Sequence, residues 1–114
     1  MSTTSKAAAK RVPTFPAKAV ADCLRDELVD AVQATARRKG TAIPTTPNEL
    51  VGAQIEIDSL VVVEILCALD EILPFQVDES VVRAGGYDSI GAAVVHVVGR
   101  VESKWQGHYD GGKS

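Results

Sequence analysis

Apolar residues recur with a helical period from residue 17 onward, beginning with a long amphipathic segment. Four of them share one face at a spacing of four residues: Val20, Leu24, Leu28 and Val32. This spacing predicts a helix over residues 17–39. Basic residues at 37–39 suit the negative end of a helix dipole, and Gly40 can take the left-handed conformation that ends many helices. The first helix is therefore expected to stop at residue 39.

Residues 41–57 interrupt the helical pattern. They contain two prolines, a glycine and several polar residues, so we expect a long loop between the first and second helices. Four apolar residues can anchor this loop against the rest of the domain: Leu50, Val51, Ile55 and Ile57.

A second helix is expected to begin at Asp58 and Ser59 and to end near Leu73, because Pro74 disfavours helical geometry in the residue before it. Its core stripe repeats at three- and four-residue spacing: Val62, Ile65, Leu66, Leu69 and Leu73. The run from residue 60 to residue 63 is more apolar than one buried face requires. Part of it should therefore be exposed, or covered by a neighbour or a partner.

Two further helices follow. A short one is expected over residues 78–84, capped by a Gly-Gly pair, and the last should run from Asp88 or Ser89 to about Trp105. Valine favours strands, but the apolar residues of the last segment fall at helical spacing: Ile90, Val94, Val97, Val98 and Val101.

Together these elements predict an all-α, four-helix bundle with a long loop between helices one and two and a short third helix. The domain should span residues 17–105, between flexible tails at residues 1–16 and 106–114. Composition adds that the core must be aliphatic, because 46% of the 114 residues are apolar and only 4% are aromatic.

Charge is distributed unevenly along the chain. Residues 45–90 carry nine acidic residues and one basic residue, a balance of −8, although the whole chain is only at −3. Such a segment repels nucleic acid and anionic membranes and favours partners with a basic face. Nucleic-acid binding is therefore not expected.

The sequence also bears on compartment and oligomeric state. The two cysteines lie on different predicted helices and match neither a disulfide framework nor a metal motif. The N-terminal residues lack the apolar core of a secretory signal, and no apolar run approaches transmembrane length. We expect a cytoplasmic monomer without a membrane span or a metal site.

Ser59 carries the most information about function, and three interpretations compete. A hydroxyl at a helix start lies beside unpaired backbone N–H groups, an environment that suits a phosphate. A catalytic serine would need an adjacent base, but His96 and His108 are the only histidines, and the G-x-S-x-G elbow is absent. Ser59 could also be a plain helix-start residue beside the Asp58 cap. The third interpretation is that it carries a covalent group.

The residues around Ser59 favour the third interpretation, because they resemble the acyl carrier protein family. The family has D-S-L at the head of its second helix, then V-E-[LI], then acidic residues. Here these elements are Asp58-Ser59-Leu60, Val63-Glu64-Ile65 and Ala68-Leu69-Asp70-Glu71. The resemblance continues through Val77-Asp78-Glu79 and Tyr87-Asp88-Ser89-Ile90, and covers about residues 17–103.

The resemblance implies a carrier protein that catalyses nothing itself. In this family a separate phosphopantetheinyl transferase uses coenzyme A and Mg²⁺ to attach 4′-phosphopantetheine to the serine. The thiol of that arm holds acyl or aminoacyl groups as thioesters and presents them to acyl-loading and acyl-transferring enzymes of fatty-acid, polyketide or related biosynthesis.

By position, the resemblance makes Ser59 the attachment site, and Asp58 would help to position the serine and the transferase. The acidic residues of helix two would meet basic patches on partners, and two apolar residues would form the centre of that contact. These partner-binding residues are Glu64, Asp70 and Glu71, with Leu60 and Val63.

The chain also departs from the family pattern. Glu56 replaces a usual glycine, Val61 and Val62 follow D-S-L where a polar or acidic residue is usual, and a Gly-Gly pair is inserted before Tyr87. These differences favour a dedicated carrier in a specialised lipid or secondary-metabolite pathway. The alternative is a carrier-like interaction module that is never modified and acts through the helix-two face.

Four further residues have expected places in the bundle. Cys23 should lie in the core and Cys67 on the outer side of helix two. His96 should lie at the rim of the last helix, because its valine neighbours supply the packing. Trp105 should close one end of the bundle.

Overall fold

Helix α2 spans Ala17–Lys39 in the computed structural model of the chain, which describes residues 13–110. These are the predicted bounds, and the predicted stop is confirmed. Gly40 adopts φ 69°, and its N–H points to the carbonyls of Ala36 and Arg37. The apolar stripe faces inward: Val20, Leu24 and Leu28 are at most 1% exposed, whereas Val32 is half-buried.

The connection between α2 and the next predicted helix is long, but it is not all loop. It contains the short helix α3, Pro47–Gly52, which the sequence analysis did not predict. Thr46 caps α3 by accepting a hydrogen bond from the N–H of Glu49 at 3.4 Å. The apolar anchors pack as expected: Leu50 and Ile57 are buried, and Val51 and Ile55 are half-buried.

The predicted second helix is present as two consecutive segments, α4 (Ser59–Ile65) and the 3₁₀ helix η1 (Leu66–Glu71). Four residues of the predicted core stripe are buried: Val62, Leu66, Leu69 and Leu73. Ile65 is only half-buried. In a 3₁₀ helix residues three apart eclipse each other, so Leu66 and Leu69 point in the same direction, towards the core.

The short third helix is the 3₁₀ helix η2, Glu79–Val81, and so is shorter than the predicted range of 78–84. The last helix, α5, spans Ile90–Asp110 and continues five residues beyond Trp105. Residues 106–110 of the expected C-terminal tail are therefore helical. Residues 13–16 of the expected N-terminal tail pack against the domain, with Phe15 buried, so the tail is shorter than predicted. Residues 1–12 and 111–114 lie outside the described residues.

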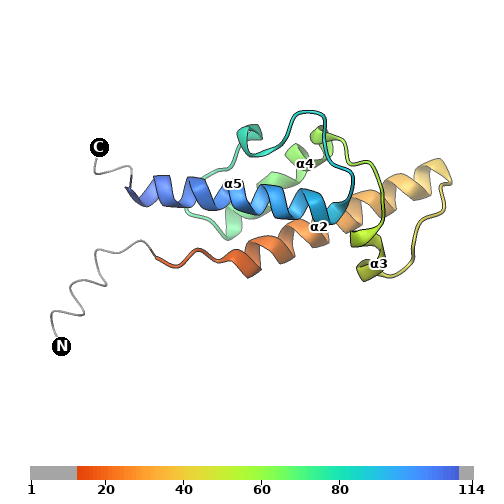
Figure 1. The fold of residues 1–114 in the computed structure, drawn as a ribbon, viewed down its shortest axis with the longest axis horizontal. Coiled ribbons are helices and arrows are strands. Elements are labelled where there is room, and N and C mark those ends of the chain that lie inside the picture. Colours follow the sequence, from red (N-terminus) through yellow and green to blue (C-terminus); the bar gives the residue numbers. More distant parts are fainter. Residues whose placement is uncertain (1–12, 111–114) are drawn as a thin grey trace.

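Helices α2 and α5 lie side by side and run in opposite directions, as Figure 1 shows. The α4–η1 segment packs against α2, and α3 contacts both long helices. The described residues form four α-helices and two 3₁₀ helices with no strand, which confirms the all-α prediction. No charged or polar side chain is buried within residues 13–109, so the core is aliphatic apart from a few aromatic rings.

Trp105 closes one end of the bundle, as predicted. It is 5% exposed, and its indole N–H donates a hydrogen bond to the carbonyl of Pro13 at 2.8 Å. The rings of Phe15, Phe75 and Tyr109 surround it at centroid distances of 5.5, 6.5 and 5.0 Å. The segment just before α2 is thereby fixed to the C-terminal half of α5.

Candidate functional site

The backbone before Ser59 is held by a short antiparallel bridge between Ile57 and Tyr87. The N–H of Ile57 donates to the carbonyl of Tyr87 at 2.7 Å, and the N–H of Tyr87 donates back to the carbonyl of Ile57 at 2.9 Å. A third bond joins the N–H of Ile55 to the carbonyl of Asp88 at 2.8 Å. Ser59 therefore begins its helix from a fixed position against the start of α5.

Gly86 allows the two segments of this bridge to come so close. It is buried and has φ 86°, a left-handed conformation that residues with a side chain rarely adopt. A Cβ atom at this position would overlap the carbonyl oxygen of Ile57 and lie 3.2 Å from the backbone nitrogen of Ser59. From the sequence alone the Gly-Gly pair is expected only as a helix cap and an insertion, because its role in positioning Ser59 depends on the distant contact with Ile57.

Asp58, rather than Ser59, caps helix α4. Its carboxylate accepts the N–H of Leu60 at 3.1 Å, and its carbonyl accepts the N–H of Val61 at 3.0 Å. The hydroxyl of Ser59 has no hydrogen-bond partner among the described residues, and Ser59 is half-buried. Its oxygen is thus not engaged in holding the helix start.

Ser89 provides a direct comparison, because it also follows an aspartate at a helix start. Its hydroxyl accepts the N–H of Ala92 at 3.0 Å and caps α5. In Asp88-Ser89 the serine performs the capping, whereas in Asp58-Ser59 the aspartate does. The two D-S pairs look alike in sequence, but the serine hydroxyl is free in the first and bound to the backbone in the second.

The predicted partner-binding residues lie on one side of α4–η1. Leu60 is 66% exposed, one of the three large apolar side chains that stand out on the described surface, and Val63 is half-buried. Glu64, Asp70 and Glu71 are exposed. The 3₁₀ geometry of η1 aligns residues three apart, which places Cys67 and Asp70 along one row, and Glu64 precedes them in the last turn of α4. Apolar and acidic side chains thus share the face that follows Ser59.

The two valines that depart from the family pattern have structural roles. Val62 is fully buried in the core, and Val61 is half-buried and packs against the core. Neither lies on the exposed face with Leu60. Glu56, which replaces a usual glycine, is exposed on the segment before Ser59.

The histidines are engaged elsewhere. His96 is half-buried, and its Nδ1 lies 2.7 Å from the hydroxyl oxygen of Tyr87. That oxygen also accepts the backbone N–H of Arg83 at 2.8 Å. Burial lowers the pKa of His96 below its usual 6.5, and the nearby Arg100 and Arg83 add to this effect. His108 packs against Phe75 near the end of α5.

The two cysteines differ in burial. Cys67 is exposed, as expected, and its Sγ lies 3.6 Å from the carbonyl of Glu64. Cys23 is only half-buried, at the edge of the core rather than within it. Burial raises the pKa of its thiol, and the neighbouring Glu27, Asp26 and Glu71 act in the same direction. The thiol of Cys23 is thus kept protonated near neutral pH.

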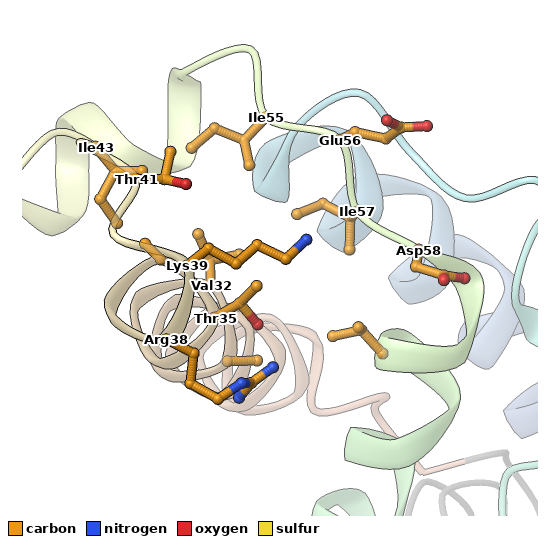
Figure 2. A pocket seen from close by; sticks show the side chains of 13 residues that line it. Val32, Thr35, Arg38, Lys39, Thr41, Ile43, Ile55, Glu56, Ile57 and Asp58 are labelled. Carbon is orange, nitrogen blue, oxygen red and sulfur yellow. The ribbon is translucent and has the colours of Figure 1, made fainter.

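A pocket of about 380 Å³ opens next to Ser59, between the C-terminal half of α2 and the segment 55–58 (Figure 2). Asp58 and Val61, on either side of Ser59 in the sequence, form part of its lining. The sequence analysis did not predict this pocket.

Across residues 13–110, no group of three or more His, Cys, Asp or Glu side chains lies close enough together to hold a metal ion. None of the helices in that range is long and apolar enough to cross a membrane.

Comparison with known proteins does not identify a family: no family model matches the chain, and neither do curated proteins or solved structures.

Proposed function

We propose that the protein is a carrier that holds acyl or aminoacyl groups as thioesters on a 4′-phosphopantetheine arm attached to Ser59. The observation that carries this proposal is the free hydroxyl of Ser59 at a helix start fixed by the Ile57–Tyr87 bridge. Ser59 lies just inside α4, after its Asp58 cap, whereas the hydroxyl of Ser89 caps α5 and is bound to the backbone. A plain helix-start serine beside the Asp58 cap would also have a free hydroxyl, so the surrounding sequence pattern is what favours an attached group. The resemblance of the D-S-L…V-E-I pattern to acyl carrier proteins supplies the identity of the attached group.

The chemistry divides between this chain and its partners. The chain provides a serine hydroxyl on a half-buried residue but no base within hydrogen-bond contact of it among the described residues. A phosphopantetheinyl transferase would remove the serine proton and, with Mg²⁺, activate the coenzyme A pyrophosphate. The serine oxygen would then bond to the phosphorus of the phosphopantetheine group as the pyrophosphate bond breaks and adenosine 3′,5′-bisphosphate leaves. The carrier contributes the position of the oxygen, while Asp58 keeps the helix start in place.

The face beyond Ser59 suits brief docking to several enzymes. Exposed carboxylates steer a basic partner and set its orientation, and the apolar patch at Leu60 supplies contact area. A small interface of this kind forms and dissociates quickly, which a carrier that visits acyl-loading and acyl-transferring enzymes in turn requires. The acidic residues would meet basic patches on those enzymes.

The test is the intact mass of the full chain after incubation with coenzyme A, Mg²⁺ and a promiscuous phosphopantetheinyl transferase. We expect one phosphopantetheine increment on the native chain and none on Ser59→Ala. Ser89→Ala is the matched control, since it removes the other serine that follows an aspartate at a helix start, and it should be modified like the native chain.

An increment on Ser59→Ala would contradict the assignment of the site. A folded native chain that neither this transferase nor that of its own host modifies would contradict the carrier function. A modified chain whose thiol accepts no acyl group from any loading enzyme would contradict the thioester step.

A second candidate function is an unmodified protein-interaction module that acts through the same face. The observation in its favour is the exposure of Leu60, which presents apolar surface whether or not Ser59 is modified. The two functions differ in the effect of Ser59→Ala. A carrier would lose thiol loading while it keeps partner binding, whereas an interaction module would lose nothing.

A further inference from the structure

The pocket beside Ser59 has an apolar wall that the fold leaves partly open to water. The wall combines residues from α2, the segment after it, the segment before Ser59 and the first turn of α4: Ala31, Val32, Ala36, Ile43, Ile55, Ile57 and Val61. Val32, Ile43, Ile55 and Val61 are only half-buried, although they pack against the core. Apolar surface in a concave site is typical of a small-molecule pocket, and about 380 Å³ lies within the usual range.

The opening of the pocket carries two cations. Arg38 and Lys39, at the end of α2, are both exposed and line the pocket. Neither takes part in an ion pair, because the ion pairs within residues 13–109 all lie between residues 18 and 26. Figure 2 shows the Lys39 side chain extending between α2 and the segment 55–58, with its ammonium group towards Ile57.

The two acids that line the pocket form no ion pair with these cations. Glu56 and Asp58 also line the pocket, but Figure 2 shows both carboxylates turned away from Lys39. The carboxylate of Asp58 is engaged with the N–H of Leu60 at the start of α4. The hydroxyls of Thr35 and Thr41 add hydrogen-bonding groups beside the cations. A ligand that lies along the apolar wall would therefore meet positive charge at its polar end.

We propose that this pocket binds an aliphatic carboxylate non-covalently. The alkyl chain lies against the wall formed by Val32, Ile43, Ile55 and Val61, and the carboxylate meets Lys39 and Arg38 at the opening. The aliphatic stem of Lys39 adds to the apolar wall while its ammonium group reaches the carboxylate. This site does not depend on modification of Ser59, so its existence can be tested independently of the carrier function.

Two trends in affinity follow from this arrangement. Each additional methylene that the wall covers should tighten binding by about fourfold, until the chain outgrows the pocket. Loss of both cations should weaken carboxylate binding by about fivefold, because ion pairs in contact with solvent are individually weak. Added salt should reduce the preference for carboxylate, since it screens exposed charges.

The experiment is an NMR titration of the unmodified full chain with octanoate and decanoate, with 1-octanol and octylammonium as neutral and cationic probes of equal chain length. We expect chemical-shift changes in residues 31–43 and 55–61, and tighter binding of decanoate than of octanoate. Among the eight-carbon probes, affinity should decrease from octanoate to octanol to octylammonium. The double variant Arg38→Gln with Lys39→Gln should remove the preference for octanoate over octanol. Arg37→Gln is the matched control, because Arg37 is an exposed neighbour that does not line this pocket.

A second variant tests the wall. Thr35→Phe places bulk in the pocket from α2, and it should abolish binding of all three eight-carbon probes if circular dichroism shows an unchanged helical fold. The proposal is overturned if octanoate does not bind at millimolar concentration, if it binds no better than octylammonium, or if the shifts lie on the face of Leu60. None of these results depends on whether a transferase modifies Ser59.

Discussion

At residue 86 the chain tolerates only glycine, for two separate reasons. The backbone has φ 86°, and the carbonyl of Ile57 occupies the space where a Cβ would lie. Gly85, its neighbour, also has a positive φ of 92°, but nothing lies within 4 Å of its Cβ position. Substitutions at the two positions therefore separate the effect of backbone conformation from the effect of the close contact with Ile57.

We expect Gly85→Ala to lower the free energy of unfolding by about 1 kcal/mol, the typical minimum for a residue forced into this conformation. Gly86→Ala should destabilise the protein clearly more, because it also forces the Ile57–Tyr87 bridge apart. Urea denaturation of both variants measures the difference. Equal losses would show that close approach at residue 86 contributes nothing. In the carrier interpretation, Gly86→Ala should also slow modification of Ser59.

His96, on α5, contacts Tyr87 in the turn that follows Gly86, and it makes the stability of the protein depend on pH. Neutral His96 can accept a hydrogen bond from the Tyr87 hydroxyl at Nδ1, and protonation of the ring removes this acceptor. Burial lowers the pKa of His96 in the folded state below its usual 6.5, with Arg100 and Arg83 acting in the same direction. The unfolded chain therefore takes up the proton at a higher pH than the folded chain does.

The sign of the pH dependence follows from this difference. The free energy of unfolding should fall as the pH decreases from about 6.5 towards the lower folded pKa, and this contribution should level off below that pKa. His96→Gln should remove this slope, which chemical denaturation between pH 7.5 and 5 can measure. His108→Gln, the matched control at the exposed histidine, should keep it. An unchanged slope in His96→Gln would rule out His96 as its source.

At the scale of elements, the α4–η1 segment has one side that packs in the core and one side that is exposed to solvent. Leu69 is fully buried on one side, and Leu60 is 66% exposed on the other. Leu69 packs the segment into the core against α2, and Leu60 remains exposed to solvent. The same residue type at both positions permits a matched comparison.

Leu69→Ala should lower the free energy of unfolding by about 2–5 kcal/mol, because it leaves a cavity in the core. Leu60→Ala should change it by at most about 0.5 kcal/mol, as is usual for an exposed site. Thermal or urea denaturation measures both. If the face of Leu60 docks the transferase, Leu60→Ala should nevertheless lower the rate of modification at Ser59. A large loss of stability in Leu60→Ala would indicate a packing role instead.

Helix α3 shows how local signals can be overlooked. Thr46-Pro47-Asn48-Glu49 has a capping residue, a proline at the first helical position and a glutamate in the first turn. This combination typically begins a helix. The prolines of residues 41–57 were interpreted as loop residues, although one of them opens α3. The signal was present in the sequence, but the high proline content of the segment masked it.

At the scale of the whole molecule, the nine acids of residues 45–90 are exposed, and none takes part in an ion pair within residues 13–109. Their mutual repulsion opposes the folded state, and salt screens it. We expect the melting temperature to rise with NaCl and with Mg²⁺ at low ionic strength. The variant Glu64→Gln with Asp70→Asn and Glu71→Gln should be more stable than the native chain at low salt and less sensitive to salt. A melting temperature that stays flat across both titrations would contradict this prediction.

The sequence by itself determined both bounds of α2, the start of α4 and most of the core residues, whereas α5 continues five residues beyond its predicted end. Helical spacing, the Gly40 cap and the Asp58 cap act over a few residues, so they can be read locally, and the bounds of α2 and the start of α4 follow from them. The exposed acidic and apolar face after Ser59 was predictable for the same reason.

Only the tertiary structure decided what surrounds Ser59. The Ile57–Tyr87 bridge joins residues thirty positions apart, and the pocket combines residues 31–43 with residues 55–61. The contact of Pro13 with Trp105 spans nearly the whole described chain. Such pairings depend on how α2 and α5 pack, because packing determines which distant backbone groups meet and which polar atoms remain free. For this reason two D-S pairs that look alike in the sequence differ in the folded protein, and only Ser59 keeps its hydroxyl free.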